Sequence, residues 1–195
     1  MALLRPTSAS DDAYVIEGDR VLLRVPRMAD YGEWAELRAR SRAFLSPWEP
    51  TWPADDLTRT AFRRRLRRYT RDIRDDEAYP FFVFSSHSGR LVGGCTLSNV
   101  RRGVAQTCSL GYWVGEPYKQ QGFTGNAVRA LIPFVFETMR LHRLEAACLP
   151  ANDASRALLV ACGFTQEGYA RNYLRIDGVW RDHLLFAILA SDPRI

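Results

Sequence analysis

The sequence predicts one α/β domain, in the broad sense that includes α+β folds, with a mixed and mostly antiparallel sheet flanked by about four helices. Helical patterns come first, at 30–43 and 55–74, and apolar strand patterns follow at 79–86, 91–99 and 106–114. A single strand–helix–strand crossover lies near the end. A chain of 195 residues with 47% hydrophobic residues is long enough for one core. We therefore treat residues 1–195 as one domain and expect residues 1–12 to be flexible.

The first elements follow from simple periodicities. Residues 15–25 alternate around Gly18-Asp19, which predicts a β-hairpin. Residues 30–43 have apolar residues at near-helical spacing, and the prolines that follow them break the chain: Pro47, Pro50 and Pro53. The second helix, 55–74, has an apolar stripe that we expect to be buried: Leu57, Phe62, Leu66 and Tyr69.

The second half of the chain alternates strands and helices. Ser88-Gly89 is a predicted turn between the first two central strands. After a helical pattern at 126–140, we expect a strand at 142–149, a short helix at 153–161 and a strand at 166–176. Asp177-Gly178 is a strong hairpin turn into a last strand at 179–189. Pro133 should kink the helix or end its first half, because proline removes one backbone hydrogen bond.

The segment from Leu110 to Gly125 is the most informative part of the chain. An apolar strand ends there, a short loop turns at Gly122 and Gly125, and a helix begins. Free backbone N–H groups then collect at the positive end of a helix dipole. This arrangement is typical of a binding site for a pyrophosphate.

Composition excludes several classes of protein. No apolar run is long enough for a membrane span, and the N-terminus lacks the apolar region of a secretory signal. Four cysteines lie far apart without a CxxC pair, so we expect no metal and read them as buried, reduced thiols: Cys95, Cys108, Cys148 and Cys162. These features favour a cytoplasmic protein.

Much of the net charge of +5 comes from one predicted helix. Seven arginines lie between residues 63 and 74 of this helix: Arg63, Arg64, Arg65, Arg67, Arg68, Arg71 and Arg74. They form either an ordinary solvated helix face or a surface that contacts RNA or an acidic partner.

Several motifs together resemble the GNAT acetyltransferase superfamily, and within it the RimJ/RimL type, closest to the RimJ-like ribosomal-protein-alanine N-acetyltransferases. The acetyl-CoA loop of this family reads Arg/Gln-x-x-Gly-x-Gly/Ala; here Lys119 and Thr124 depart from it, whereas Gly122 matches. The surrounding segments carry the resemblance: Leu97 to Gly103, Leu110-Gly-Tyr112, Leu141-His-Arg143, Gly163-Phe164, Glu167 to Ala170, Tyr173-Leu174 and Ile176 to His183.

The resemblance implies acetyl transfer from acetyl-CoA to a primary amine, with no metal. It implies that the sheet splays at the strand that holds the pantetheine arm of the cofactor. The residues expected to bind the cofactor are Tyr112, Trp113, Val114, Lys119, Gln120, Gln121, Gly122, Phe123, Thr124, Gly125, Asn152 and Ser155. In relatives a hydroxyl at the position of Ser155 is proposed to protonate the leaving thiolate. Asn152 and Ser155 also read as an ordinary helix start.

The general base is not evident. Many relatives have a glutamate just before the Leu-Gly of the pantetheine strand, where this chain has Ser109. An N-terminal α-amine, with a pKa of about 7.7–8.0, needs a base less than a lysine side chain does. His183 is a tentative catalytic residue, and Glu167 and Asp182 are candidate bases through water. We expect Ser109, Tyr169, Tyr173 and Trp48 near the acceptor, although the aromatic residues equally suit packing.

Three functions remain open at this point. The first is acetylation of a protein N-terminus; the resemblance implies alanine of a small-subunit ribosomal protein, with ribosomal RNA contacting the arginine-rich helix. The second is acetylation of a small amine or antibiotic. The third is a non-catalytic ribosome- or RNA-binding module. The sequence does not decide between a monomer and a homodimer.

Overall fold

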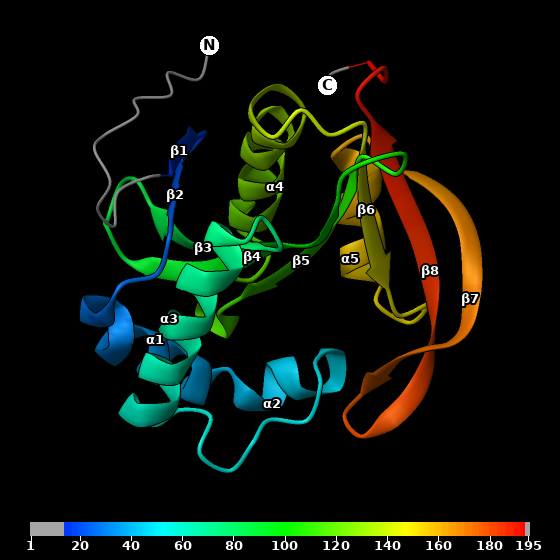
Figure 1. Ribbon diagram of the computed structural model, residues 1–195. Coiled ribbons are helices and arrows are strands. Elements are labelled where there is room, and N and C mark those ends of the chain that lie inside the picture. Colours follow the sequence, from blue (N-terminus) through cyan, green and yellow to red (C-terminus); the bar gives the residue numbers. More distant parts are fainter. Residues whose placement is uncertain (1–13, 194–195) are drawn as a thin grey trace.

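One mixed sheet organises the computed structural model, which describes residues 14–193. Eight strands lie in the order β1-β2-β3-β4-β5-β6-β8-β7 (Figure 1). Every neighbouring pair is antiparallel except β5 and β6, which are parallel. The strands are β1 (Val15–Gly18), β2 (Val21–Arg24), β3 (Tyr79–Ser85), β4 (Leu91–Arg101), β5 (Thr107–Val114), β6 (Arg143–Cys148), β7 (Thr165–Ile176) and β8 (Val179–Leu189). This architecture confirms the predicted fold class.

Five α-helices of the described chain flank the sheet (Figure 1). They are α1 (Tyr31–Arg40), α2 (Arg42–Leu45), α3 (Arg59–Arg74), α4 (Phe123–Pro133) and α5 (Asp153–Ala161). The helix predicted at 30–43 is divided at Ser41, whose N–H already bonds to the carbonyls of Leu37 and Arg38. Short 3-10 turns complete the set: η1 (Met28–Asp30), η2 (Ser46–Trp48) and η3 (Glu116–Tyr118).

The two faces of the sheet have separate cores. We call the first the α4 core; α4 and α5 pack there on inward-facing strand residues such as Leu97, Leu110 and Leu144. We call the second the α3 core; it joins α1 and α3 to the outer strands through Trp34, Phe62, Phe82, Phe84 and Leu91. Successive strand residues point to opposite faces, so the core that a residue joins shows the face on which it lies.

The start of α3 differs from the sequence prediction. We expected a helix from Asp55, but the first helical residue is Arg59. Thr58 is the N-cap, and its hydroxyl accepts a hydrogen bond from the Ala61 N–H at 3.2 Å. Residues 53–58 instead form turns closed by Asp56 N to Pro53 O and Thr58 N to Asp55 O. A side-chain cap of this kind fixes where a helix begins.

Pro133 changes the helix as predicted. Regular α4 ends there, and a π-helical turn, η4 (Phe134–Thr138), continues the chain. Phe134, Val135 and Phe136 in this turn are buried in the α4 core. The wider turn keeps these apolar side chains packed while accommodating the missing proline N–H.

The remaining structural expectations concern cysteines, metals and membranes. All four cysteines are free and buried, as predicted. Within residues 14–193 no cluster of three or more His, Cys, Asp or Glu could hold a metal ion. No helix in this range has the length and apolarity needed to cross a membrane. Residues 1–12, which we expected to be flexible, lie outside the described part of the chain.

Candidate active site

The sheet opens between β5 and β6. The two strands pair from Thr107 with Arg143 to Leu110 with Ala146, and the pairing ends there although both strands continue. Figure 1 shows them diverging toward the lower side of the molecule. From Gly111 to Val114, β5 therefore has one edge whose main-chain groups face no partner strand. An extended chain can pair with such an edge like an added strand.

The loop after β5 brings a helix N-terminus to this opening. Gly122 is the N-cap of α4 and has a left-handed φ of 83°, a conformation that glycine adopts without strain. Among residues 14–193 no side chain caps the helix, and its first internal hydrogen bond runs from Asn126 N to Gly122 O. The N–H groups of Phe123, Thr124 and Gly125 precede that bond. They are the donors that a bound phosphate accepts from.

The side chains of the loop contribute less than its backbone. Lys119 Nζ is 3.2 Å from Glu116 Oε1 and 5.3 Å from the centroid of the Phe44 ring. Gln121 Nε2 donates to Pro117 O at 2.8 Å, and Gln120 has a positive φ of 59°. The Phe123 ring is buried in the α4 core. An anion would therefore meet main-chain donors first, with the half-exposed Lys119 as an adjustable charge.

Two hydroxyls meet across the opening. Tyr112 on β5 and Ser155 on α5 have their oxygen atoms 2.6 Å apart. Burial raises the pKa of Tyr112 well above its usual range, so the phenol keeps its proton and can donate it to Ser155 Oγ. Asn152 Oδ1 accepts from the Ser155 N–H at 3.0 Å and caps α5, as the helix-start interpretation expected. The structure thus brings together three predicted site residues from two elements.

Trp113 lies on the opposite face of the sheet from Tyr112. Tyr112 packs on the α4 core, whereas the adjacent Trp113 packs on the α3 core. The Arg38 guanidinium lies between two indoles, 4.9 Å from the centroid of Trp113 and 4.0 Å from that of Trp52. Glu49 holds Arg38 through two contacts of 2.7 Å and accepts a hydrogen bond from Trp52 Nε1. Sequence reasoning missed this cluster because it joins α1, the α2–α3 loop and β5.

The face of the sheet that carries the α3 core also has a carboxylate that the sequence analysis did not single out. Ser109 on β5 is in register with Glu145 on β6, so both side chains project to the face opposite the α4 core. Arg143 Nε is 2.9 Å from Glu145 Oε1, and Arg101 Nη2 is 3.4 Å from Glu145 Oε2. Ser109 Oγ accepts from Asn99 at 3.4 Å. Only the parallel register, which the sequence does not reveal, places Glu145 beside Ser109.

The two carboxylates considered as bases are already engaged. Glu167 forms a two-point ion pair with Arg143, and the hydrogen bonds from Arg143 lower the pKa of Glu167. Asp182 accepts from the Tyr169 hydroxyl and from the Asn172 N–H, and these bonds lower the pKa of Asp182. A carboxylate with a lowered pKa is a weaker base.

His183 and the nearby tyrosines have distinct surroundings. His183 is 2% exposed, and its Nδ1 lies 3.0 Å from the carbonyl oxygen of Arg181. Tyr173 packs edge-on against its ring at 5.7 Å. Tyr169 is in register with Leu184 of the α4 core and therefore projects to the cofactor side. Of the two tyrosines, Tyr173 lies nearer the expected acceptor side. Trp48 is 37% exposed at the end of η2.

The α2–α3 loop and the β7–β8 hairpin meet on the face of the sheet that carries the α3 core. The Asp177 N–H donates to the carbonyl oxygen of Glu49 at 2.9 Å. A Cβ added to Gly178 would lie 3.5 Å from Thr51 Oγ1, which shows how closely the tip approaches the loop. Figure 1 shows the tip of the hairpin beside the end of α2, below the point where β5 and β6 diverge.

Comparisons with known proteins agree with this geometry. Residues 20–165 match the family described as "Acetyltransferase (GNAT) domain". The [ribosomal protein uS5]-alanine N-acetyltransferase of Escherichia coli K12 is 34% identical over 174 residues, which cover 89% of this chain and 90% of that protein. The structure of Mycobacterium smegmatis RimJ in complex with CoA-disulfide has a TM-score of 0.84 at 33% identity, covering 91% of this chain and 87% of that one.

A second solved structure is equally similar. The ribosomal-protein-S5-alanine acetyltransferase of Vibrio fischeri has a TM-score of 0.84 at 30% identity, covering 92% of this chain and 98% of that one. The chain belongs to the GNAT acetyltransferase family, and it is an acetyl-CoA-dependent N-acetyltransferase. The uncapped N-terminus of α4 and the open edge of β5 fit the two polar parts of that cofactor, its pyrophosphate and its pantetheine arm.

The left-handed conformation of Gly122 gives a direct test of the cofactor loop. Gly122→Ala should weaken acetyl-CoA binding about tenfold, because a side chain disfavours φ of 83° and the loop will shift its N–H groups. Isothermal titration calorimetry measures the change. Gly89→Ala is a matched control, since Gly89 has φ of 67° in the distant β3–β4 turn and neither glycine has an atom within 4 Å of an added Cβ. Equal binding losses in both variants would contradict a specific role for Gly122.

Proposed function

We propose that this protein is a cytoplasmic enzyme that acetylates the N-terminal α-amine of a polypeptide, with alanine of a small-subunit ribosomal protein as the physiological acceptor. The E. coli relative is named for alanine of ribosomal protein uS5, and 89% of this chain aligns with it. That name supports the class of acceptor. The chemistry of the α3 side of the sheet, where we expect the acceptor, supports the same class of acceptor independently.

The observation that carries the proposal is the state of the carboxylates near the opening. Ser109 occupies the position where many relatives have a glutamate, and Glu145 beside it is held by Arg143 and Arg101. Glu167 and Asp182 have lowered pKa values. At pH 7 an α-amine is already about a tenth to a fifth unprotonated, whereas deprotonating a lysine side chain costs about 4–5 kcal/mol. A site with weak bases therefore favours the α-amine.

The bridge between Glu49 and Asp177 supports the same acceptor. The hydrogen bond ties the loop to the hairpin below the opening, on the side where we expect the acceptor to approach. A free chain end can pass beside such a closed boundary. A lysine side chain within a folded surface can approach only together with the polypeptide on both sides of it. We infer that the bridge favours chain ends over internal side chains.

Acetyl-CoA, when bound, supplies the acetyl group as a thioester. The side chains of this protein then have to orient the amine and return a proton to the leaving sulfur. We propose Ser155 Oγ for the second task, because it lies beside the Tyr112 hydroxyl of β5. The Tyr112 and Ser155 hydroxyl oxygens are 2.6 Å apart, and either hydroxyl can donate to the other. Tyr112 thus positions Ser155, and positioning of this kind lowers the barrier without a strong base.

The acceptor preference has a distinctive pH dependence. With an Ala-starting peptide, kcat/KM should rise about tenfold per pH unit up to about pH 7.7 and then level off. With an Nα-blocked lysine peptide it should keep rising toward about pH 10 and be about a hundredfold or more lower at pH 7. Release of CoA thiol measures both rates. Faster acetylation of free small amines or of lysine at pH 7 would contradict the proposal.

The role of Ser155 predicts a split between turnover and binding. Ser155→Ala should lower kcat about tenfold to a hundredfold with little change in acetyl-CoA affinity, because only the proton donor is lost. Tyr112→Phe should lower kcat less. Asp153→Ala is the control; Asp153 is exposed on the same turn of α5, and its ion-pair partner there is Arg156. Unchanged turnover in Ser155→Ala would remove this residue from the mechanism.

We also propose that α3 contacts ribosomal RNA through the exposed Arg63 and Arg67, which lie one turn apart. No acidic partner of either is found among residues 14–193, whereas Arg64, Arg65, Arg68, Arg71 and Arg74 all have one.

Arg63→Ala/Arg67→Ala should reduce the salt dependence of RNA binding by about 1.5 in log–log slope, because two phosphate contacts are lost. Fluorescence anisotropy with a ribosomal RNA fragment measures this slope. Arg40→Ala, an exposed arginine on α1, should not change it. An unchanged slope in the double variant would contradict the RNA contact.

A further inference from the structure

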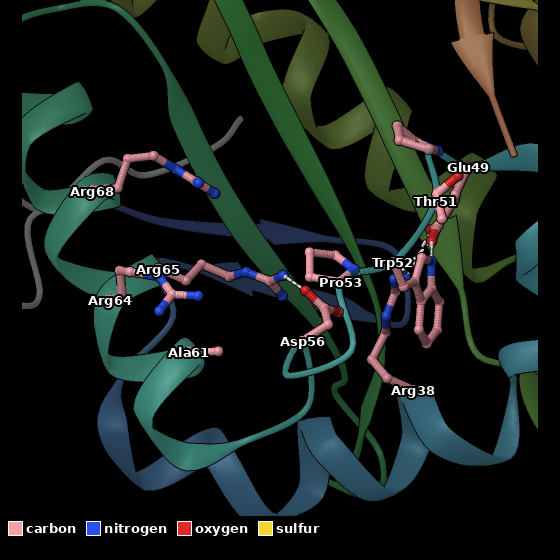
Figure 2. A pocket seen from close by; sticks show the side chains of 11 residues that line it. Arg38, Glu49, Thr51, Trp52, Pro53, Asp56, Ala61, Arg64, Arg65 and Arg68 are labelled. Atoms are coloured by element: carbon pink, nitrogen blue, oxygen red, sulfur yellow. Dashed lines mark hydrogen bonds and ion pairs between the residues drawn. The ribbon is translucent and has the colours of Figure 1, made fainter. Parts of the chain in front are cut away.

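A pocket of about 480 Å³ lies between α3 and the loop that precedes it. Figure 2 shows Arg64, Arg65 and Arg68 projecting from α3 on one side, and Glu49, Thr51 and Trp52 of the loop on the other. Arg38 of α1 forms part of its wall. The family resemblance and the cofactor site do not account for this pocket.

The pocket lies on the side from which the acceptor arrives. The N-terminus of α4 and Ser155 of α5 place the cofactor on the α4 side of the sheet. The amine must then reach the thioester from the α3 side. Two pocket residues border that route: Glu49 forms the bridge to Asp177, and Arg38 contacts Trp113 on β5. The pocket therefore shares two lining residues, Arg38 and Glu49, with the boundary of the expected acceptor route.

The electrostatics of the pocket are positive. Four arginines face two carboxylates, and both carboxylates are already neutralised: Glu49 by Arg38 at 2.7 Å, and Asp56 by Arg65 at 2.6 Å. Arg64 and Arg68 at the rim are 67% and 56% exposed. Arg64 pairs with the exposed Asp55 at 3.1 Å, a surface pair of little energy that can be exchanged for a ligand. Arg68 lies 4.0 Å from the largely buried Asp72, a long contact that Arg68 can also give up for a ligand.

We propose that this pocket binds the stretch of the acceptor polypeptide that follows its acetylated residue, and that it selects acidic side chains there. Arg64 and Arg68 are the specificity-determining residues. Arg38 and Trp52 form a rigid wall, since Arg38 is clamped by Glu49 and stacked between Trp52 and Trp113. This inference rests on the proposed acetylation of a chain end and specifies the class of chain.

An acidic peptide fits this pocket better than RNA does. The rim arginines point into a recess bounded by the prolines and Trp52 of the loop, beside the expected acceptor route to β5. Arg63 and Arg67 do not line that recess. The phosphate backbone of RNA would contact Arg63 and Arg67 first. Only a chain that runs along the pocket passes Arg64 and Arg68.

The test compares three Ala-starting peptides that are identical except for a downstream stretch of glutamate, glutamine or lysine. In the wild-type enzyme, kcat/KM should be about threefold to tenfold higher for the glutamate peptide than for the glutamine peptide, and lowest for the lysine peptide. The preference should shrink with added salt. It should nearly disappear in Arg64→Ala/Arg68→Ala, mainly through KM. Arg63→Ala/Arg67→Ala removes the same charge from the same helix outside the pocket and should keep the preference.

The outcomes separate this inference from the proposed function. Acetylation of all three peptides at one rate would overturn the acidic preference while leaving the enzyme an N-terminal acetyltransferase. No acetylation of the glutamine peptide would count against the proposed function itself. A third result, in which Arg64→Ala/Arg68→Ala loses binding to a ribosomal RNA fragment but keeps the peptide preference, would assign the pocket to RNA and refute the proposal.

Discussion

Two parallel strands that hydrogen-bond over four residues and then separate leave one of them with main-chain groups that the sheet does not satisfy. In this protein β5 is that strand, and the separation comes after Leu110 and Ala146. Gly111 is exposed and Tyr112 to Val114 are half-buried, so these main-chain groups are accessible to an added chain. The cofactor arm of a GNAT enzyme can be that added chain, and the helix N-terminus that follows β5 can hold its phosphates. The position of every other site residue depends on this separation.

The alternation of side chains along β5 then divides the chemistry between the two faces. Tyr112 points to the α4 side and meets Ser155, the residue that we propose returns a proton to sulfur. Trp113 points to the α3 side and contacts Arg38, on the side where we propose that the acceptor arrives. Ser109 lies on the acceptor side by the same alternation, beside a glutamate already bound to two arginines. A shift of one residue in the register of β5 would exchange these roles.

Local signals predicted the elements that local interactions define. The bounds of α5 and β8 agree with the expectation, because Asn152 caps the helix and Asp177-Gly178 forms the turn before the strand. The predicted start of α3 at Asp55 was wrong because Thr58 provides the N-cap of the helix. The pairs Tyr112–Ser155 and Glu145–Ser109 join different elements, and their proximity depends on strand order and parallel register. Periodicity carries no information on those, so only the resemblance indicated Ser155.

The arginine-rich helix shows why net charge alone was ambiguous. Of the seven arginines between residues 63 and 74, five are paired with aspartates on the same helix or in the adjoining segment, which cancels much of their charge at a distance. What matters is the direction in which each one points. Arg65 is committed to Asp56, and the contacts of the exposed Arg64 and Arg68 can be exchanged. A helix with 3.6 residues per turn separates these arginines from Arg63 and Arg67. One basic helix can therefore present one charged surface to the expected acceptor route and another to a polyanion outside it.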